Sequence, residues 1–271
     1  MEADPRPPVQ PRVRSAPPPP REIPTARIVI ATICFAVLLV VSMYGFHRYE
    51  QFLIRDARFA LNGPDGSWDT ATLEIAGASH ASVGAVEAVF SADAGQSVYL
   101  LPLNDRRASL RAVNWVRDAS IQRMWPNRVI VQIAERVPVA YIMIAPAHSG
   151  LIDEDGVILP PTPEKFRLPL LIGVRPTDAI EDRHRRVQKM MRLMNDLGKD
   201  SGKISQVDIS DPDNLKIMLP WDGRKLTLLM GDHAYAQRYA NFVGNYSEIK
   251  KRVPGASTLD VRLEDRITAV E

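Results

Sequence analysis

Cysteine is nearly absent from this sequence, because its 271 residues contain only one, Cys34. Cys34 lies inside an apolar run near the N-terminus, so the polar body that follows has no thiol for a disulfide or for nucleophilic catalysis. Histidine is also scarce, and the five histidines lack the spacing of metal ligands. The body must therefore be stabilised by packing, and we expect it to hold no metal.

The motifs of common enzymes are missing as well. The sequence has no glycine-rich phosphate loop and no Gly-x-Ser-x-Gly elbow. Residues 153–156 (Asp-Glu-Asp-Gly) resemble the middle of a calcium loop, but Leu151 and Thr162 occupy the first and twelfth ligand positions. Asp153 and Asp155 form a carboxylate pair of the kind that can act as acid and base, yet their context favours a solvated tight turn. With a net charge of +2, which does not indicate polyanion binding, we expect a non-enzymatic protein without a cofactor.

The most informative feature that is present is one uncharged apolar run from Ile28 to Phe46. These nineteen residues would span about 29 Å as a helix, close to the bilayer hydrocarbon core of about 30 Å. A cleaved signal peptide is the alternative, but its apolar region is usually about 7–15 residues long and ends in a small-x-small site. This run instead ends with Met43-Tyr44-Gly45-Phe46, so we predict an uncleaved transmembrane helix.

The charges on the two sides of this run predict its orientation. The preceding residues contain five arginines and no lysine, namely Arg6, Arg12, Arg14, Arg21 and Arg27. Only Arg48, Arg55 and Arg58 lie in the first dozen residues beyond it. Because the basic side of a span stays in the cytoplasm, we expect a single-pass type II protein with a cytoplasmic N-terminus and a periplasmic body.

Residues 1–24 contain nine prolines. Proline lacks an amide donor and fixes φ, so we expect this head to be extended and solvated. Its Pro-x-x-Pro spacings leave two interpretations open, a simple tether or a ligand for another protein, and the tether is favoured.

A first folded unit of about 70 residues is predicted beyond the helix. Residues 50–59 continue the helical pattern, and Asn62-Gly63-Pro64-Asp65-Gly66 breaks it. The following order of strand, helix, helix, strand and strand predicts an α+β unit with its helices on one sheet face. Ser82 should cap the first of these helices, and Trp125-Pro126 forms the last turn, where we expect Trp125 to be buried. The strands are expected at 72–75, 115–123 and 128–135, and the helices at 82–90 and 105–113.

A second unit is predicted after Pro138. It contains one helix that begins at Asp178, carries a methionine stripe on its core face and stops at Gly198. A second helix should be capped by Asp232 and should turn Val243 inward with its aromatic residues. The strand candidates are residues 139–144, 151–153, 157–159, 203–209, 215–219, 225–230, 258–263 and 267–270.

Five motifs follow one another along the body. They are residues 114–127 (Asn-Trp-Val-Arg-Asp-Ala-Ser-Ile-Gln-Arg-Met-Trp-Pro-Asn) with the exit 133–140 (Ile-Ala-Glu-Arg-Val-Pro-Val-Ala), Leu151-Ile152-Asp153 with Gly156, Leu168-Pro169-Leu170-Leu171-Ile172-Gly173, Leu229-Met230-Gly231-Asp232 with Arg238, and Leu259-Asp260-Val261-Arg262-Leu263. Each motif is weak alone, but in this order and with this topology the chain resembles the FtsQ/DivIB cell-division proteins from its span to its end.

The resemblance implies an α+β fold in which a single transmembrane helix precedes a polypeptide-transport-associated (POTRA) domain and a second, mixed β-rich domain. The implied parts are a cytoplasmic tail (1–27), the transmembrane helix (28–46), a juxtamembrane segment (47–69), the POTRA domain (70–138) and the β-domain (139–271). Residues 135–138 read either as the joint between the domains or as an ordinary strand end. The implied function is that of a non-enzymatic scaffold of the divisome at the septum of the inner membrane. It would bind bitopic proteins of the FtsB and FtsL type and link early to late division proteins.

The resemblance also implies a partner-binding edge, because the last strand of the family's β-domain docks FtsB. Independently, a terminal strand leaves a row of backbone N–H and C=O groups that an incoming strand can satisfy. Charges along this edge either prevent self-pairing or contact a partner, and the resemblance favours a partner. Leu263 stands where family members often have an aromatic residue. The candidate partner-binding residues are Arg262, Leu263, Glu264, Asp265, Arg266, Ile267, Thr268 and Ala269.

Two other functions stay open from the residues alone. One is a POTRA-bearing secretion or outer-membrane assembly factor, and the other is a membrane-anchored periplasmic hydrolase. The roughly 130 residues after Pro138 include helices and are too few for a large barrel, which disfavours the first alternative.

Overall fold

The computed structural model describes residues 25–61, 72–146, 148–263 and 266–270. The proline-rich head, the break predicted at residues 62–66, and Glu264 and Asp265 lie outside the described residues. The chain divides into two compact units, Met1–Arg55 and Asp56–Glu271.

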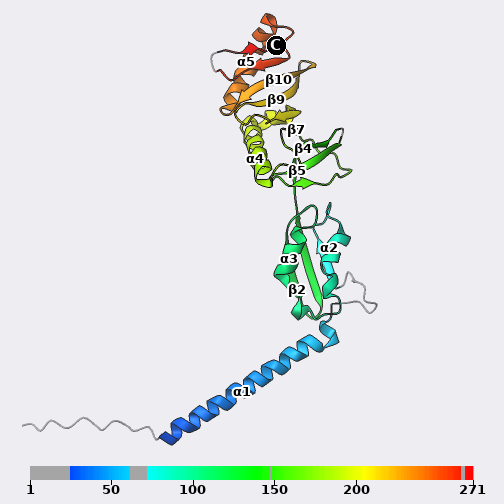
Figure 1. Cartoon of the computed structure of the whole chain (residues 1–271), viewed down its shortest axis with the longest axis vertical. Helices are drawn as coiled ribbons and strands as arrows, with labels where there is room; N and C mark the ends of the chain where they lie inside the picture. The colour runs from blue at the N-terminus through cyan, green and yellow to red at the C-terminus, as the bar shows by residue number, and fades with distance from the viewer. Residues whose placement is uncertain (1–24, 62–71, 147, 264–265, 271) are drawn as a thin grey trace, which may run out of the picture. The chain divides into compact units, whose positions relative to one another are not determined.

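The predicted apolar run lies within one long helix, α1 (Thr25–Arg55), at the start of the chain in Figure 1. The span candidate within α1 has a mean hydropathy of 2.5 and is not buried by other parts of the chain, and the helix is long enough to cross a membrane. The helical continuation predicted beyond the run extends to Arg55 and is followed by a 3₁₀ turn, Ala57–Phe59. Asp56 caps this turn by accepting a hydrogen bond from the Arg58 N–H at 3.0 Å. The side-chain hydrogen bond from Arg58 lowers the pKa of Asp56 to about 2.

The first folded part of the second unit is a small sheet with two helices, which we call the three-stranded domain. Its strand order is β1-β3-β2, with β1 parallel and β2 antiparallel to β3. Its elements are β1 (Leu73–Ala76), α2 (Val83–Val89), the 3₁₀ turns η2 (Ser91–Asp93) and η3 (Val98–Leu100), α3 (Leu103–Arg111), β2 (Val116–Met124) and β3 (Arg128–Glu135).

Alternate residues of β3 form one side of the core of the three-stranded domain. Val129, Val131 and Ile133 are buried and belong to one hydrophobic cluster with residues of both helices. Ser82 caps α2 as predicted, since its Oγ accepts a hydrogen bond from the Ala85 N–H at 3.3 Å. The helix predicted to begin at residue 105 begins at Leu103 instead, directly after Pro102 at the N-cap position.

The expectation that Trp125 is buried is wrong. Its side chain is 53 % exposed, and the preceding Met124 is 46 % exposed. The cause is the length of the hairpin, because the last three residues of β2 are all exposed and the turn projects beyond the covered part of the sheet. Trp125 makes an edge-on contact with Phe59, with ring centroids 5.5 Å apart.

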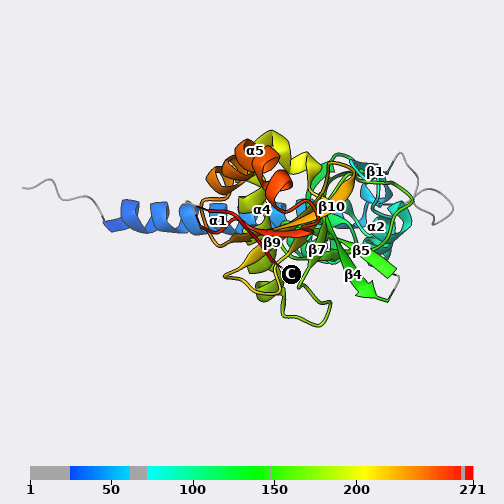
Figure 2. The same cartoon turned by 90° about the horizontal axis from the view of Figure 1, so that it is seen from above.

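The remaining strands form one nine-stranded sheet, and we call this part the nine-stranded domain. The strand order is β12-β11-β10-β9-β8-β7-β4-β5-β6. The helices α4 (Ile180–Leu197) and α5 (Tyr235–Arg252) lie on the same side of this sheet, as Figures 1 and 2 show. The strands are β4 (Pro138–Ala145), β5 (His148–Asp153), β6 (Ile158–Leu159), β7 (Leu170–Ile172), β8 (Gln206–Asp208), β9 (Leu215–Trp221), β10 (Arg224–Gly231), β11 (Thr258–Asp260) and β12 (Thr268–Ala269). The predicted α+β class is thus confirmed.

Helix α4 covers the sheet with the predicted apolar stripe. Met190 is buried and Met194 partly buried in the core, and Gly198 ends the helix with φ 53°. Asp178 does not start the helix, which begins at Ile180. Its carboxylate instead accepts a hydrogen bond from the Arg175 N–H at 2.9 Å, so it closes the preceding turn.

Helix α5 differs from its prediction in two respects. Asp232 does not cap it, because Ala234 adopts a left-handed conformation and the helix begins only at Tyr235. Val243, expected on the inner face, is 45 % exposed, whereas the neighbouring Phe242 is fully buried.

Several predicted strands are shorter in the structure. The strand expected at 203–209 is reduced to β8, because residues 198–203 form 3₁₀ turns after α4. The last two candidates, 258–263 and 267–270, shrink to the three residues of β11 and the two of β12.

Residues 135–138 connect the two sheets with little free chain. Glu135 ends β3 and Pro138 begins β4, so only Arg136 and Val137 lie between them. The Arg136 guanidinium donates to the Asp153 carboxylate at 2.6 Å, and Asp153 is 2 % exposed. Leu151 and Leu159 of the nine-stranded domain also belong to the hydrophobic cluster of the three-stranded domain, so the two domains share packed contacts.

His80 forms a second link between these domains. Its ring is stacked on Trp115 with centroids 4.6 Å apart. Its Nδ1 lies 2.8 Å from Glu135, and its Nε2 lies 2.8 Å from Glu164 in the loop between β6 and β7. Glu135 also accepts backbone N–H groups of residues 79, 80 and 81, each at 2.7 Å.

Candidate functional site

The terminal strand β12 is the outermost strand at one end of the nine-stranded sheet. It pairs antiparallel with β11, where Ala269 lies opposite Leu259 and Thr268 opposite Asp260. The Val270 N–H continues this pairing by donating to the Thr258 carbonyl at 3.0 Å. The other side of β12 has no strand beside it among the residues that the structure describes.

The pairing fixes which backbone groups of this edge point outward. In an antiparallel pair, successive residues direct their N–H and C=O groups alternately toward and away from the partner strand. Because Val270 donates toward β11, Ala269 directs its N–H and C=O away from the sheet. Ile267, two residues from Ala269, directs its N–H and C=O away from the sheet as well. A strand added at this edge would therefore bond to Ile267 and Ala269.

The chain reaches this edge through a turn that Asp260 and Arg262 hold. The Asp260 carboxylate accepts the Arg262 backbone N–H at 3.0 Å and its Nε at 2.8 Å. This side-chain bond from Arg262 lowers the pKa of Asp260, and it raises the pKa of Arg262 in turn. Val261 is buried between them, and its N–H donates to the Leu229 carbonyl at 3.3 Å. The turn is thus fastened to β10.

Two further motif residues converge on the same place. Gly231 has φ +72°, and a Cβ there would lie 2.5 Å from the Arg238 Nη1 and 3.4 Å from the Arg262 side chain. Arg238 is only 7 % exposed and donates to the Met230 carbonyl at 2.6 Å. Glycine at position 231 leaves room for this buried guanidinium, so two motifs that are separate in sequence support the last strand together.

A hollow of about 300 Å³ lies beside the terminal strand. Arg266 and Ile267 line one side, and residues of α5 and its end line the other: Asn241, Asn245, Glu248, Ile249, Arg252 and Val253. Ile267 is half-buried against the core, while Arg266 is exposed. The hollow offers both apolar and charged contacts to a side chain that projects from an added strand.

The structure brings most of the predicted site residues to one edge, although few of them are in the strand itself. Thr268 and Ala269 form β12, Arg262 holds the preceding turn, and Leu263 is 44 % exposed. The two acidic members, Glu264 and Asp265, lie outside the described residues. The sequence prediction named Arg238 as a motif residue but did not place it, or the α5 residues of the hollow, in the candidate site. The signal available in the sequence was that Arg238 is an arginine close to the apolar positions of α5, which indicates a buried guanidinium.

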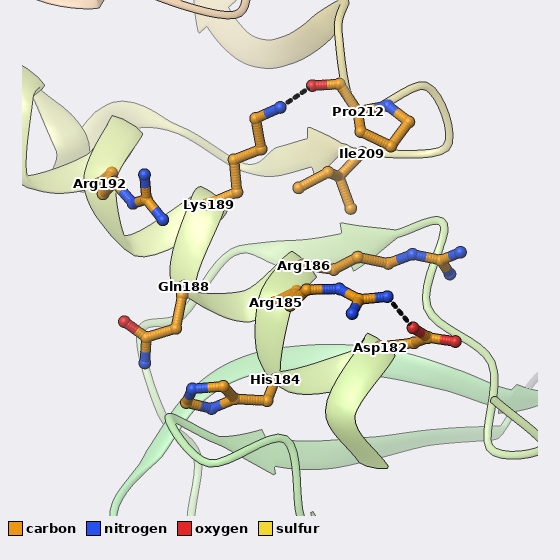
Figure 3. A pocket seen from close by; sticks show the side chains of 9 residues that line it. All are labelled: Asp182, His184, Arg185, Arg186, Gln188, Lys189, Arg192, Ile209 and Pro212. Carbon is orange, nitrogen blue, oxygen red and sulfur yellow. Dashed lines mark hydrogen bonds and ion pairs between the residues drawn. The ribbon is translucent and has the colours of Figure 1, made fainter. Parts of the chain in front are cut away.

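A larger hollow, of about 690 Å³, lies on α4 (Figure 3). Its cations are mostly engaged: Arg185 pairs with Asp182, and Lys189 donates to the Pro212 carbonyl. Arg186 pairs with Asp178 at 2.8 Å. The lining residues include no Ser, Thr or Cys and are mainly basic, so this hollow offers a basic surface.

No group of three His, Cys, Asp or Glu side chains that could hold a metal ion occurs within the described residues. The Asp153 turn is structural, since one carboxylate oxygen accepts the N–H groups of Asp155 at 3.1 Å and Val157 at 2.7 Å. The other oxygen binds Arg136. What the candidate site at β12 can do is pair its outward backbone groups with an added strand.

Family models match both folded domains. The model of the FtsQ-type POTRA domain matches residues 70–136, and that of the C-terminal domain of the cell-division protein FtsQ/DivIB matches residues 140–262. Together they cover well over half of the chain. The chain belongs to the FtsQ/DivIB family. The three-stranded domain is accordingly a POTRA domain, and the nine-stranded domain is the FtsQ/DivIB β-domain.

Similar proteins carry the same family name. The chain is 28 % identical over 255 residues to the "Cell division protein FtsQ" of Koribacter versatilis, which covers 89 % of this chain and 69 % of that protein. It is 28 % identical over 229 residues to FtsQ of Caulobacter vibrioides strain NA1000, covering 77 % of this chain and 74 % of the relative. FtsQ of Zymomonas mobilis is 31 % identical over 112 residues, which cover 41 % of this chain and 35 % of that protein. With α1, these relatives fit a single-pass membrane protein of the division machinery.

Proposed function

We propose that this protein is a non-enzymatic scaffold of the bacterial divisome that binds bitopic partners of the FtsB and FtsL type and links early to late division proteins. In this proposal α1 anchors it in the inner membrane at the septum, with the N-terminus in the cytoplasm and the body in the periplasm. The POTRA domain comprises residues 70–138, and the β-domain comprises residues 139–271.

The observation that carries the proposal is the open side of β12. Outward backbone groups at Ile267 and Ala269, beside a hollow of about 300 Å³, offer what an incoming strand requires. Backbone pairing would supply affinity, and the hollow would select a side chain of the partner. The FtsQ/DivIB models over both domains favour this role over a secretion or outer-membrane assembly factor.

The decisive experiment replaces Ile267 by proline in the full-length protein. Proline removes the outward N–H donor, and an edge position limits the damage to the rest of the sheet. Ile267→Val is the matched control, because it keeps the donor and most of the side chain. We expect Ile267→Pro to lose co-purification of the FtsB- and FtsL-type partners from native membranes, while Ile267→Val retains it.

A second comparison separates backbone pairing from charge. Arg266 is exposed, and screened charges at the rim of an interface contribute little, so Arg266→Glu should weaken co-purification less than Ile267→Pro does. Circular dichroism establishes that each variant is folded. Normal partner recovery with a folded Ile267→Pro protein would remove this edge from the mechanism.

A further inference from the structure

The turn between β2 and β3 carries an apolar surface that partner binding at β12 does not use. Leu100, Met124 and Trp125 are 45 %, 46 % and 53 % exposed, respectively. Phe59 stands edge-on against Trp125, with ring centroids 5.5 Å apart. We call these four residues the tip patch. Large apolar side chains that are exposed together usually mark a contact surface.

The tip patch lies where the chain enters the POTRA domain. Ala60, the residue after Phe59, forms a β-bridge with Ser97, and the Leu61 N–H donates to the Gln96 carbonyl at 2.9 Å. These bonds bring the entering chain beside the segment that contains Leu100. Arg123 of β2 donates to the carbonyl of Leu101, which ties the hairpin to the same segment.

The distance along the chain from the membrane helix to this patch is short. Phe46 ends the uncharged run, and Arg55 ends α1 nine residues later, which is about 14 Å of helix. Phe59 is four residues beyond Arg55, and a fully extended chain covers at most about 14 Å between their Cα atoms. The headgroup layer itself is about 5–7 Å thick on each side, and membrane helices commonly tilt. The connection therefore limits Phe59 to within about 28 Å of Phe46, a length over which a tilt of α1 can bring the tip patch onto the bilayer surface.

We propose that the tip patch docks on the lipid–water interface of the membrane that α1 spans. Tryptophan is enriched at this interface because its ring is apolar and its N–H remains hydrated. Two nearby arginines are balanced by carboxylates, since Arg58 pairs with Asp56 at 2.9 Å and Arg128 with Glu74 at 3.1 Å, whereas Arg123 donates to the Leu101 carbonyl. We assign the docking to the apolar side chains and not to attraction by anionic lipid.

The test places the full-length protein in phosphatidylcholine nanodiscs, with or without bromine on the acyl chains near the headgroup. Brominated chains quench tryptophan on contact. Trp68 lies outside the described residues, so Trp68→Phe serves as the common background. Trp115 is buried and Trp221 is packed against α5, which leaves Trp125 as the exposed reporter. We expect quenching in the background protein and its loss in Trp125→Phe, whereas Trp221→Phe keeps it.

A second readout does not depend on replacing Trp125. A spin label on Met124→Cys, in a Cys34→Ala protein, should be accessible to oxygen dissolved in lipid and shielded from a water-soluble nickel complex. Equal quenching before and after Trp125→Phe would overturn the proposal, and so would a water-exposed label at position 124. In either case the tip patch would be left for a protein partner. Retained quenching when phosphatidylglycerol is added or salt is raised would support the apolar mechanism.

Discussion

Asp153 binds the short connection between the two domains through a buried ion pair. Its carboxylate is almost fully buried, and it binds the Arg136 guanidinium as well as two backbone N–H groups of its own turn. Arg136 comes from the connection between β3 and β4, so this one pair joins the connection to the turn after β5. Removing one partner of a buried ion pair costs far more than the pair contributes, because the other charge is left unpaired.

We therefore expect Arg136→Met to lower the free energy of unfolding by about 3 kcal/mol, at the lower end of the range for a broken buried pair. Arg117→Met is the matched control. Arg117 pairs with Glu154 at 2.6 Å, but both side chains are substantially exposed, so its loss should cost below about 1 kcal/mol. Urea unfolding of both variants measures the difference. Similar losses in the two variants would show that the Asp153 site is hydrated.

Residue types predicted local structure well where one physical role dominates. Ser82 was predicted as a cap and is one, and Gly198 ends α4 with a positive φ that glycine adopts without strain. Asp178 and Asp232 have equally suitable side chains for a cap, but neither caps its helix. Asp232 pairs with the adjacent His233, and Ala234 takes the cap position of α5. Asp178 binds Arg186, which arrives from two turns further along α4. Whether an aspartate caps a helix or binds another group therefore depends on the folded structure, and the local sequence does not show it.

At the scale of elements, the His80 link joins β3 of the POTRA domain to a loop of the β-domain. Hydrogen bonds that the His80 ring makes to the carboxylate of Glu135 and then to that of Glu164 raise the pKa of His80. Burial alone would raise the pKa of Glu135, but the Ala81 and His80 hydrogen bonds outweigh burial and lower it. A raised histidine pKa stabilises the fold below about pH 6.5 and loses this effect as the pH rises through the folded value. The lowered pKa of Glu135 gives stability that is lost only as the pH falls through the pKa of Glu135 in the folded protein. The link is therefore strongest in mildly acidic solution, where His80 is protonated and Glu135 is ionised.

His80→Gln should therefore destabilise the protein more at pH 6 than at pH 9. Glutamine retains a polar side chain of similar reach and removes the titrating charge. The measurement is the urea midpoint of both proteins at the two pH values, with Arg117→Met as an ion-pair control without a histidine. An equal shift at both values would show that protonation of His80 contributes nothing to the joint.

The edge strand shows what sequence alone could not provide at this scale. The terminal position of the strand was predicted, and β12 is the outermost strand. Its length was not predicted, because the strand-like composition extends from Ile267 to Val270 while only Thr268 and Ala269 have regular pairing. The Asp260–Arg262 pair turns the chain away from β11, and that pair becomes visible only when the side chains are placed. The hollow beside β12 likewise depends on α5, which lies about twenty residues earlier in the chain.

At the scale of the whole molecule, the proposed orientation makes a prediction about its two ends. Five arginines precede the apolar run, and this basic excess should hold the N-terminus in the cytoplasm. A C-terminal alkaline phosphatase fusion should therefore be active, because this enzyme matures only outside the cytoplasm. A C-terminal GFP fusion should be dark in the same cells. An inactive phosphatase fusion with a fluorescent GFP fusion would reverse the assigned topology.

The order of domains was the most predictable property of the chain. One apolar run, one strand–helix–helix–strand–strand unit and a second mixed unit were each visible in the pattern, and family models match both folded parts. The packing between the domains was not predictable. Leu151 and Leu159 lie in strands that were predicted for the second unit, yet they join the core cluster of the first. Periodicity shows that a side chain is buried, but it does not show which core receives it.

The uneven pairing along the large sheet has a mechanical consequence. The sheet is one continuous path of hydrogen bonds from β12 to β6, and β6 in turn packs against the POTRA core. Two residue pairs hold β12 to β11, whereas seven join β9 to β10. A load applied through a partner at β12 passes first through the shortest of these joints. Under tension β12 should therefore peel away from β11 before β10 separates from β9, so that overload at this edge releases the partner first.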